Sequence, residues 1–123
     1  MGLKPRRRAL TPRDALRAFA FDLPGAWEDN PWGESVAKVG KKVFVFFGVS
    51  EDFGFAVKLP DSAYGVLEFP FATPTGYGLG KAGWVSIKWQ PDLPLELLQS
   101  WILESYRTIA TKKLVAELDA RQP

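Results

Sequence analysis

Two pairs of adjacent carboxylates, Glu28-Asp29 and Glu51-Asp52, are candidates for acid–base catalysis. Two carboxyl groups can act as acid and base when their surroundings separate their pKa values. Neighbouring side chains on a strand point to opposite faces, however, so neither pair is expected to meet on one substrate atom. We expect both pairs to lie in turns exposed to solvent.

The residue types that many enzymes use at neutral pH are missing, because the chain has no histidine and no cysteine. Histidine serves most often as a general base near pH 7, and a cysteine thiolate is a nucleophile and a metal ligand. Gly76, Gly78 and Gly80 form G-x-G-x-G, which is not the dinucleotide fingerprint. The sequence therefore predicts a protein with no enzymatic activity, no metal site and no cofactor.

The net charge of +2 is unevenly distributed along the chain. Four of the 16 basic residues lie among the first eight residues, which leaves 12 basic and 14 acidic residues, a net charge of −2, for the rest. A basic tail of this kind is either a solvated end or a contact to nucleic acid. The candidate residues for nucleic-acid binding are Arg6, Arg7 and Arg8 in the tail, Lys41 and Lys42 at a predicted hairpin tip, and Lys58 and Lys81.

Large aromatic residues form a second group of candidates. They either fill the core with their polar atoms hydrogen-bonded, or line a groove in which aromatic faces and lysines hold a base or another planar anion. The groove candidates are Trp27, Trp32, Lys38, Tyr77 and Trp84.

The local patterns predict a helix that begins after Thr11, with proline at its first position, and ends before Pro24-Gly25. Alternating residues predict strands over 35–39 and 42–47, joined at Gly40-Lys41, and a third strand over 53–59. These short connections require antiparallel pairing.

The second half of the chain continues with a short helix over 61–68 and a glycine-rich loop over 71–83. A strand follows over 84–89, with Val85 and Ile87 on one face and Trp84 on the other, and one of these faces is expected to pack on the core. One long helix, capped by Asp92, is expected to run to about residue 118. The order predicts an α+β fold of two layers, an antiparallel sheet with helices packed on one face.

We expect a single domain over residues 11–123, preceded by a flexible basic tail over residues 1–10. No run of about 20 apolar residues is present, so no membrane contact is expected. The absence of cysteine favours the cytoplasm.

Several motifs in series resemble the MmcQ/YjbR family: residues 24–33, 38–44 and 57–60, the loop from Tyr77 to Trp84, and Ser105-Tyr106. The resemblance implies a fold similar to the CyaY-like and secretion-chaperone-like folds. It also implies DNA binding through hairpins acting as wings, with no catalytic residues. The chain departs from the family pattern at Gly78 and Gly80, where members often have histidine and asparagine.

The resulting hypothesis is a non-enzymatic protein that binds DNA weakly, without sequence preference, through a basic hairpin wing and tail. Two alternatives stay open: a chaperone-like module that binds a protein partner, and a small-molecule-binding domain that uses the aromatic groove.

Overall fold

A computed structural model describes residues 11–48, 53–76, 78–89 and 92–121 of the chain. The tail predicted over residues 1–10 lies outside these ranges. The helices are α1 (Pro12–Phe21), α2 (Ala63–Val66), α3 (Leu95–Ile109) and α4 (Lys112–Arg121), with 3-10 turns η1 (Pro31–Gly33) and η2 (Leu79–Ala82). The strands are β1 (Ala26–Asp29), β2 (Ser35–Val39), β3 (Lys42–Phe47), β4 (Phe53–Lys58), β5 (Ala72–Pro74) and β6 (Trp84–Lys88).

Helix α1 begins where the sequence predicts. Thr11 accepts a hydrogen bond from the backbone of Asp14, and the Asp14 carboxylate accepts one from the backbone of Thr11. Such a cap contributes about 0.5–2 kcal/mol. Leu16 and Ala20 on the inner face are fully buried, so α1 packs against the core.

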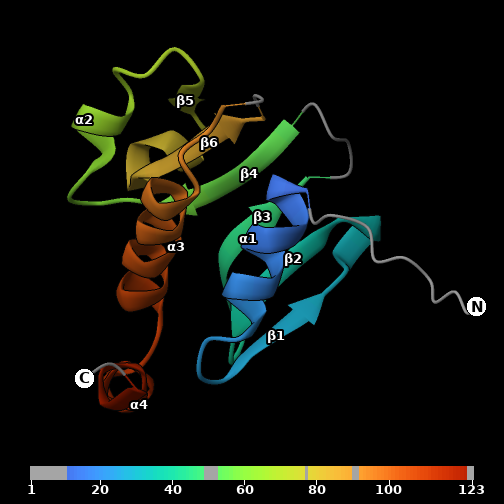
Figure 1. Ribbon diagram of the computed structural model, residues 1–123, viewed down its shortest axis with the longest axis vertical. Coiled ribbons are helices and arrows are strands. Elements are labelled where there is room, and N and C mark those ends of the chain that lie inside the picture. The colour runs from blue at the N-terminus through green and yellow to red at the C-terminus, as the bar shows by residue number, and fades with distance from the viewer. Residues whose placement is uncertain (1–10, 49–52, 77, 90–91, 122–123) are drawn as a thin grey trace, which may run out of the picture.

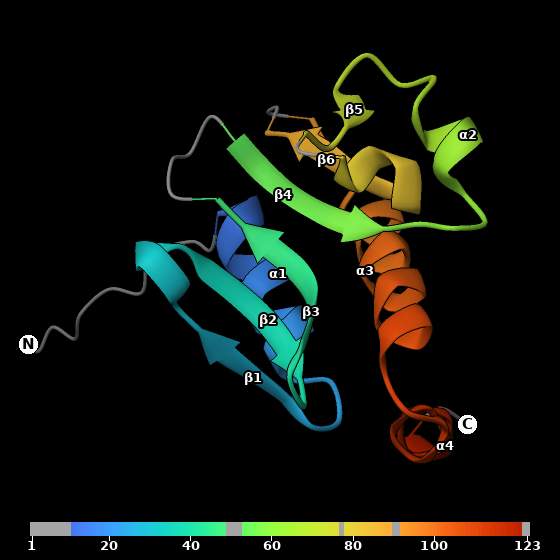
Figure 2. The ribbon, with the colours of Figure 1, turned by 180° about the vertical axis from the view of Figure 1, so that it is seen from behind.

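The six strands form one antiparallel sheet in the order β1-β2-β3-β4-β6-β5. Helices α1 and α3 cover one face, and no α-helix of the described residues covers the opposite face (Figures 1 and 2). The helix-covered core includes Phe47, Phe55 and Ile87 from the sheet and Leu98 and Ile102 from α3. The predicted α+β class is therefore confirmed. None of the helices in the described ranges is long and apolar enough to cross a membrane.

Two edge strands were not predicted. β1 contains the acidic pair Glu28-Asp29, which was expected in an exposed turn, and β5 lies within the predicted loop over 71–83. β1 forms because both acids gain basic partners beside the strand, Arg17 for Glu28 and Lys38 for Asp29. β5 ends at Pro74, which an edge strand tolerates because one side of it needs no ladder hydrogen bonds.

The predicted long C-terminal helix is instead two helices. Its N-cap is Pro94 rather than Asp92, and the chain leaves helical geometry at Ala110, with φ −73° and ψ 157°. Thr111 then caps α4, because its hydroxyl accepts a hydrogen bond from the backbone of Leu114 at 3.3 Å. The cap competes with helix continuation at this point. Helix α4 consequently turns away from α3 (Figure 1).

Candidate functional site

The antiparallel register brings most of the predicted binding residues to one end of the sheet, here called the hairpin end. The β2–β3 turn at Gly40–Lys41 lies there, and so does the start of β1, because Ala26 pairs with Val39. The end of β4 and the start of β6 lie there too, because Lys58 pairs with Trp84. The residues gathered at the hairpin end are Trp27, Lys38, Lys41, Lys42, Lys58 and Trp84, with Lys81 in η2 just before β6.

Ser105 of α3 forms hydrogen bonds with the backbones of β3 and β4 at this end. The extra residue Phe44 interrupts the β2–β3 register, since Ala37 pairs with Val45 but Lys38 with Val43. The buried Ser105 hydroxyl donates to the Phe44 carbonyl at 2.6 Å and accepts from the Lys58 backbone at 2.9 Å. A side chain from α3 thus satisfies two backbone groups that β3 and β4 do not pair directly.

The hairpin tip rests against the corner between α3 and α4 and does not stand free as a wing. Lys41 and Lys42 are exposed and line a hollow of about 270 Å³. Its other walls are Val39, Gly40, Ile109, Thr111 and Leu114. Close packing continues beside it, because a Cβ at Gly25, where φ is +72°, would lie 3.0 Å from Leu114 Cδ2.

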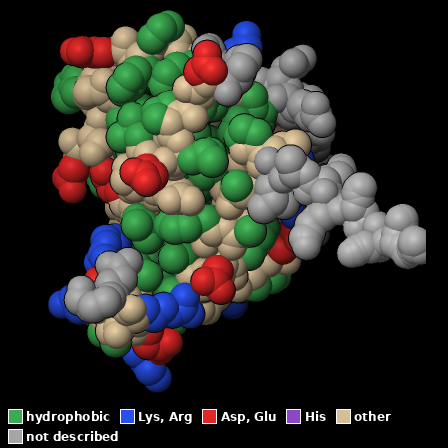
Figure 3. Space-filling view, in the orientation of Figure 1, with side chains coloured by type: hydrophobic (Ala, Val, Ile, Leu, Met, Phe, Trp, Pro, Cys, Tyr) green, Lys and Arg blue, Asp and Glu red, His purple; other side chains and the backbone are tan. Residues whose placement is uncertain are grey.

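Lys112 and Lys113, which sequence reasoning missed, also belong to this corner. Both are exposed and directly follow Thr111, which lines the hollow. Lysine and arginine side chains gather over α4 at the lower left of Figure 3. The signal that could have found them is Thr111 followed by two lysines, a helix start that the continuous apolar stripe concealed.

Trp27 is half-exposed, at 44%. It lies on the sheet face away from the helices, because it pairs with Lys38, whose neighbours Ala37 and Val39 belong to the helix-covered core. Its Nε1 donates to the carbonyl of Gly40 at 3.0 Å, which joins the ring to the hairpin tip. The Lys38 ammonium lies 5.4 Å from the ring centroid and pairs with Asp29 at 2.7 Å. The hydrogen bond from Lys38, followed by that from the Asn30 backbone, lowers the pKa of Asp29. The charge of Lys38 is therefore matched locally.

Trp84 is not placed as a second wall of a groove with Trp27. Three strands separate β1 from β6, so the two residues lie about 19 Å apart at the usual strand spacing. Trp84 is 8% exposed and packs edge-on against Phe46, with ring centroids 5.1 Å apart. It lies on the sheet face predicted for it, but mainly fills space there.

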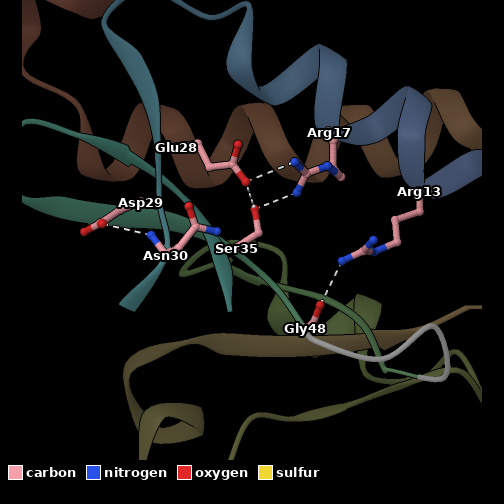
Figure 4. A network of polar contacts seen from close by, with 7 residues as sticks. All are labelled: Arg13, Arg17, Glu28, Asp29, Asn30, Ser35 and Gly48. Carbon is pink, nitrogen blue, oxygen red and sulfur yellow. Dashed lines mark hydrogen bonds and ion pairs between the residues drawn. The ribbon is translucent and has the colours of Figure 1, made fainter. Parts of the chain in front are cut away.

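The carboxylates of β1 point to opposite faces, as the alternation rule predicts. Glu28 accepts hydrogen bonds from Ser35 at 2.6 Å and from Arg17 of α1 at 3.0 Å, whereas Asp29 accepts one from the Asn30 backbone (Figure 4). Asp29 also accepts a hydrogen bond from Lys38. The bond from Ser35, and then that from Arg17, lowers the pKa of Glu28. Both acids are thus held as charged partners of basic residues. Glu51 and Asp52 lie outside the described residues.

The remaining predicted residues do not join the hairpin end. Arg6, Arg7, Arg8 and Tyr77 lie outside the described residues, and Trp32 belongs to η1, beyond the far end of β1. The first described residues, at the start of α1, also lie at that far end of the sheet. Arg13 Nη2, in the first turn of α1, donates to the carbonyl of Gly48 at 2.8 Å, just after β3 ends (Figure 4).

The comparisons with known proteins agree with this fold. The sequence model of the YjbR family matches residues 21–108. The fold is similar to the crystal structure of Deinococcus radiodurans protein DR2400, a DUF419 domain, with a TM-score of 0.71 and 26% identity, over 89% of this chain and 91% of that one. No curated protein sequence matches. Because the family match spans the sheet and most of α3, and the structural neighbour carries a domain of the same family, the chain belongs to the YjbR family.

Proposed function

We propose that the protein is a non-enzymatic binding protein and that its hairpin end contacts the phosphate backbone of DNA. One observation carries the proposal: two segments far apart in the sequence, each with a pair of exposed lysines, border one hollow. Lys41 and Lys42 of the hairpin tip line the hollow, and Lys112 and Lys113 directly follow Thr111, which lines it from the start of α4. None of the seven described residues that line the hollow is acidic. We call these four lysines the basic corner.

The chemistry of the basic corner favours weak binding without sequence preference. Lysine ammonium groups bind phosphates as point charges, and such contacts position a protein without reading bases. Four phosphate contacts predict a log–log salt slope of about −3.6 for duplex DNA. Lys58 and Lys81 lie at the same end of the sheet and add two basic side chains there.

Around the basic corner, the neighbouring surface carries acidic residues and arginines that are paired with acidic residues. Arg107 pairs with Asp119 at 2.7 Å, and Arg121 with Asp22 at 3.6 Å. Asp61 and Glu104 line a second hollow on the outer side of α3. The basic corner is therefore the part of this surface that we assign to the DNA backbone.

The absence of histidine and cysteine from the sequence supports a role without catalysis. The use of the Glu28 and Asp29 carboxylates as partners of Arg17 and Lys38 supports it further. A chain without cysteine also suits the reducing cytoplasm, where we place the protein.

Fluorescence anisotropy with a labelled duplex between about 50 and 200 mM salt tests the proposal. Lys41→Glu should weaken binding and make the salt slope shallower. Lys88→Glu is the matched control, because Lys88 is equally an exposed lysine but pairs with Phe53 at the opposite end of the sheet. Equal effects of the two variants would move the site away from the basic corner. No binding by the unaltered protein at the lowest salt would reject DNA and leave a protein partner as the better hypothesis.

A further inference from the structure

Trp27 combines three properties that a base-stacking residue needs. It is exposed, it is held in one orientation, and it lies beside cationic groups. Its side chain is 44% exposed, and its Nε1 hydrogen bond ends on Gly40, the residue directly before Lys41. The indole is thus attached to the strand turn that carries the two tip lysines.

The surroundings of Trp27 also lower the free-energy cost of stacking a ligand on its ring. Its ring is restrained by Gly40 on one side and by Lys38, 5.4 Å from its centroid, on another. A ring already ordered in the free protein loses little side-chain freedom when a ligand stacks on it. The Lys38 charge is matched by Asp29, so no unpaired charge is covered by an incoming base.

Other aromatic side chains of the described residues lack this combination. Tyr64 on α2 is 92% exposed, but α2 lies away from the hairpin tip (Figure 1). Trp84 is at the hairpin end, but it is buried against Phe46. Trp27 is therefore the aromatic residue whose position and exposure both suit a ligand held by Lys41 and Lys42.

We infer that Trp27 stacks on an unpaired nucleobase, and that the DNA ligand of the hairpin end is single-stranded. This inference rests on the proposed function and specifies the form of the nucleic acid. Bases inside a duplex already stack on each other, and separating one step costs a few kcal/mol. A single strand offers base faces without that cost, and aromatic stacking tolerates every base. The lysines of the tip hold the phosphates next to the stacked base.

Anisotropy with a labelled oligothymidylate strand and with a mixed-sequence duplex of equal length tests the inference at low salt. Trp27→Leu keeps the apolar bulk but removes the aromatic face, so it should weaken single-strand binding by about 5- to 100-fold, the loss of one base stack. Duplex binding should change less than about twofold, because the phosphate contacts remain. Trp27→Phe keeps a ring face and should retain most of the single-strand affinity.

Tyr64→Ala is the matched control, since it removes an exposed aromatic ring away from the tip and should leave both affinities unchanged. Retained single-strand affinity in Trp27→Leu, or an equal loss for strand and duplex, would overturn the inference while DNA binding by the protein itself stands. An equal loss would assign Trp27 to support of the hairpin tip. Absence of binding to either ligand by the unaltered protein would instead overturn the proposed function. Unfolding midpoints of both Trp27 variants identify any loss that comes from misfolding.

Discussion

The Ser105 hydroxyl on α3 donates a hydrogen bond to the Phe44 carbonyl on β3, 2.6 Å away and 61 residues earlier in the chain. The same oxygen accepts a hydrogen bond from the Lys58 backbone, so one buried hydroxyl satisfies a backbone group on each of two strands.

Ser105→Ala leaves both backbone groups without this partner and should lower the free energy of unfolding by about 1–3 kcal/mol. Urea denaturation measures the loss. Ser100→Ala, which removes only an exposed bond to Leu97, should change stability by less than about 0.5 kcal/mol. Similar midpoints for the two variants would contradict the role of Ser105.

The close approach of Gly25 to Leu114 predicts that alanine is not tolerated at position 25. Gly25 has φ +72°, and an added Cβ would lie 3.0 Å from Leu114 Cδ2. Backbone strain in this left-handed conformation costs about 1–2 kcal/mol before any steric clash is added. Gly25→Ala should therefore lower the thermal midpoint. Gly65→Ala in α2, where an added Cβ meets nothing within 4 Å, should leave the midpoint unchanged or raise it.

Ile102 and Ile109 lie on the same apolar stripe but differ in burial. Ile102 is 0% exposed, so Ile102→Ala should cost about 2–5 kcal/mol. Ile109 is only partly buried, beside the hollow at the basic corner, and its truncation should cost less. Chemical denaturation of both variants provides the comparison. A larger loss at Ile109 would show that the corner, rather than the sheet face, limits stability.

The charged carboxylate of Glu28 should stabilise the folded protein at neutral pH but not at acidic pH. Its pKa is lowered from the usual 4.5 by Ser35 and Arg17, so the native state binds this proton less readily than the unfolded chain. The contribution of the charged carboxylate is complete above the unfolded pKa and is lost as the pH falls through the lower native pKa. Glu28→Gln should thus destabilise the protein at pH 7 and approach the unaltered protein in stability as the pH falls below the lowered native pKa. Ser35→Ala should reproduce part of this pH dependence, and urea midpoints across pH detect both.

The basic tail and the hairpin tip should contribute separately to DNA binding. The described chain starts at Thr11, and the first turn of α1 lies by Gly48, at the opposite end of the sheet from Lys41. Deleting residues 1 to 8 should therefore weaken binding by a factor that multiplies with the effect of Lys41→Glu plus Lys42→Glu. Each change should also make the log–log salt slope shallower. Fluorescence anisotropy over a range of salt concentrations measures both effects. Strong non-additivity would indicate that tail and tip meet on the same phosphates.

Elements with local sequence signals could be predicted without the structure. Thr11, Pro12 and Asp14 specify the start of α1 through a cap formed within four residues. Alternation around Gly40 specifies the β2–β3 hairpin, because side chains on a strand alternate between core and solvent. These elements, together with connections too short for parallel crossovers, were sufficient to predict the α+β class.

Other features could not be predicted, because they depend on contacts between segments that are distant in the sequence. The acidic β1 becomes a strand because Arg17 and Lys38 lie beside it, and neither partner can be identified from the local pattern around Glu28 and Asp29. The basic corner exists because the chain breaks at Ala110 and returns α4 to the hairpin tip, 70 residues after Lys42. Burial of Trp84 and exposure of Trp27 depend likewise on their neighbours across the sheet. Such contacts form only when the whole chain packs. Their stabilising energy comes from residues that are far apart in the sequence, so no short stretch of sequence predicts them.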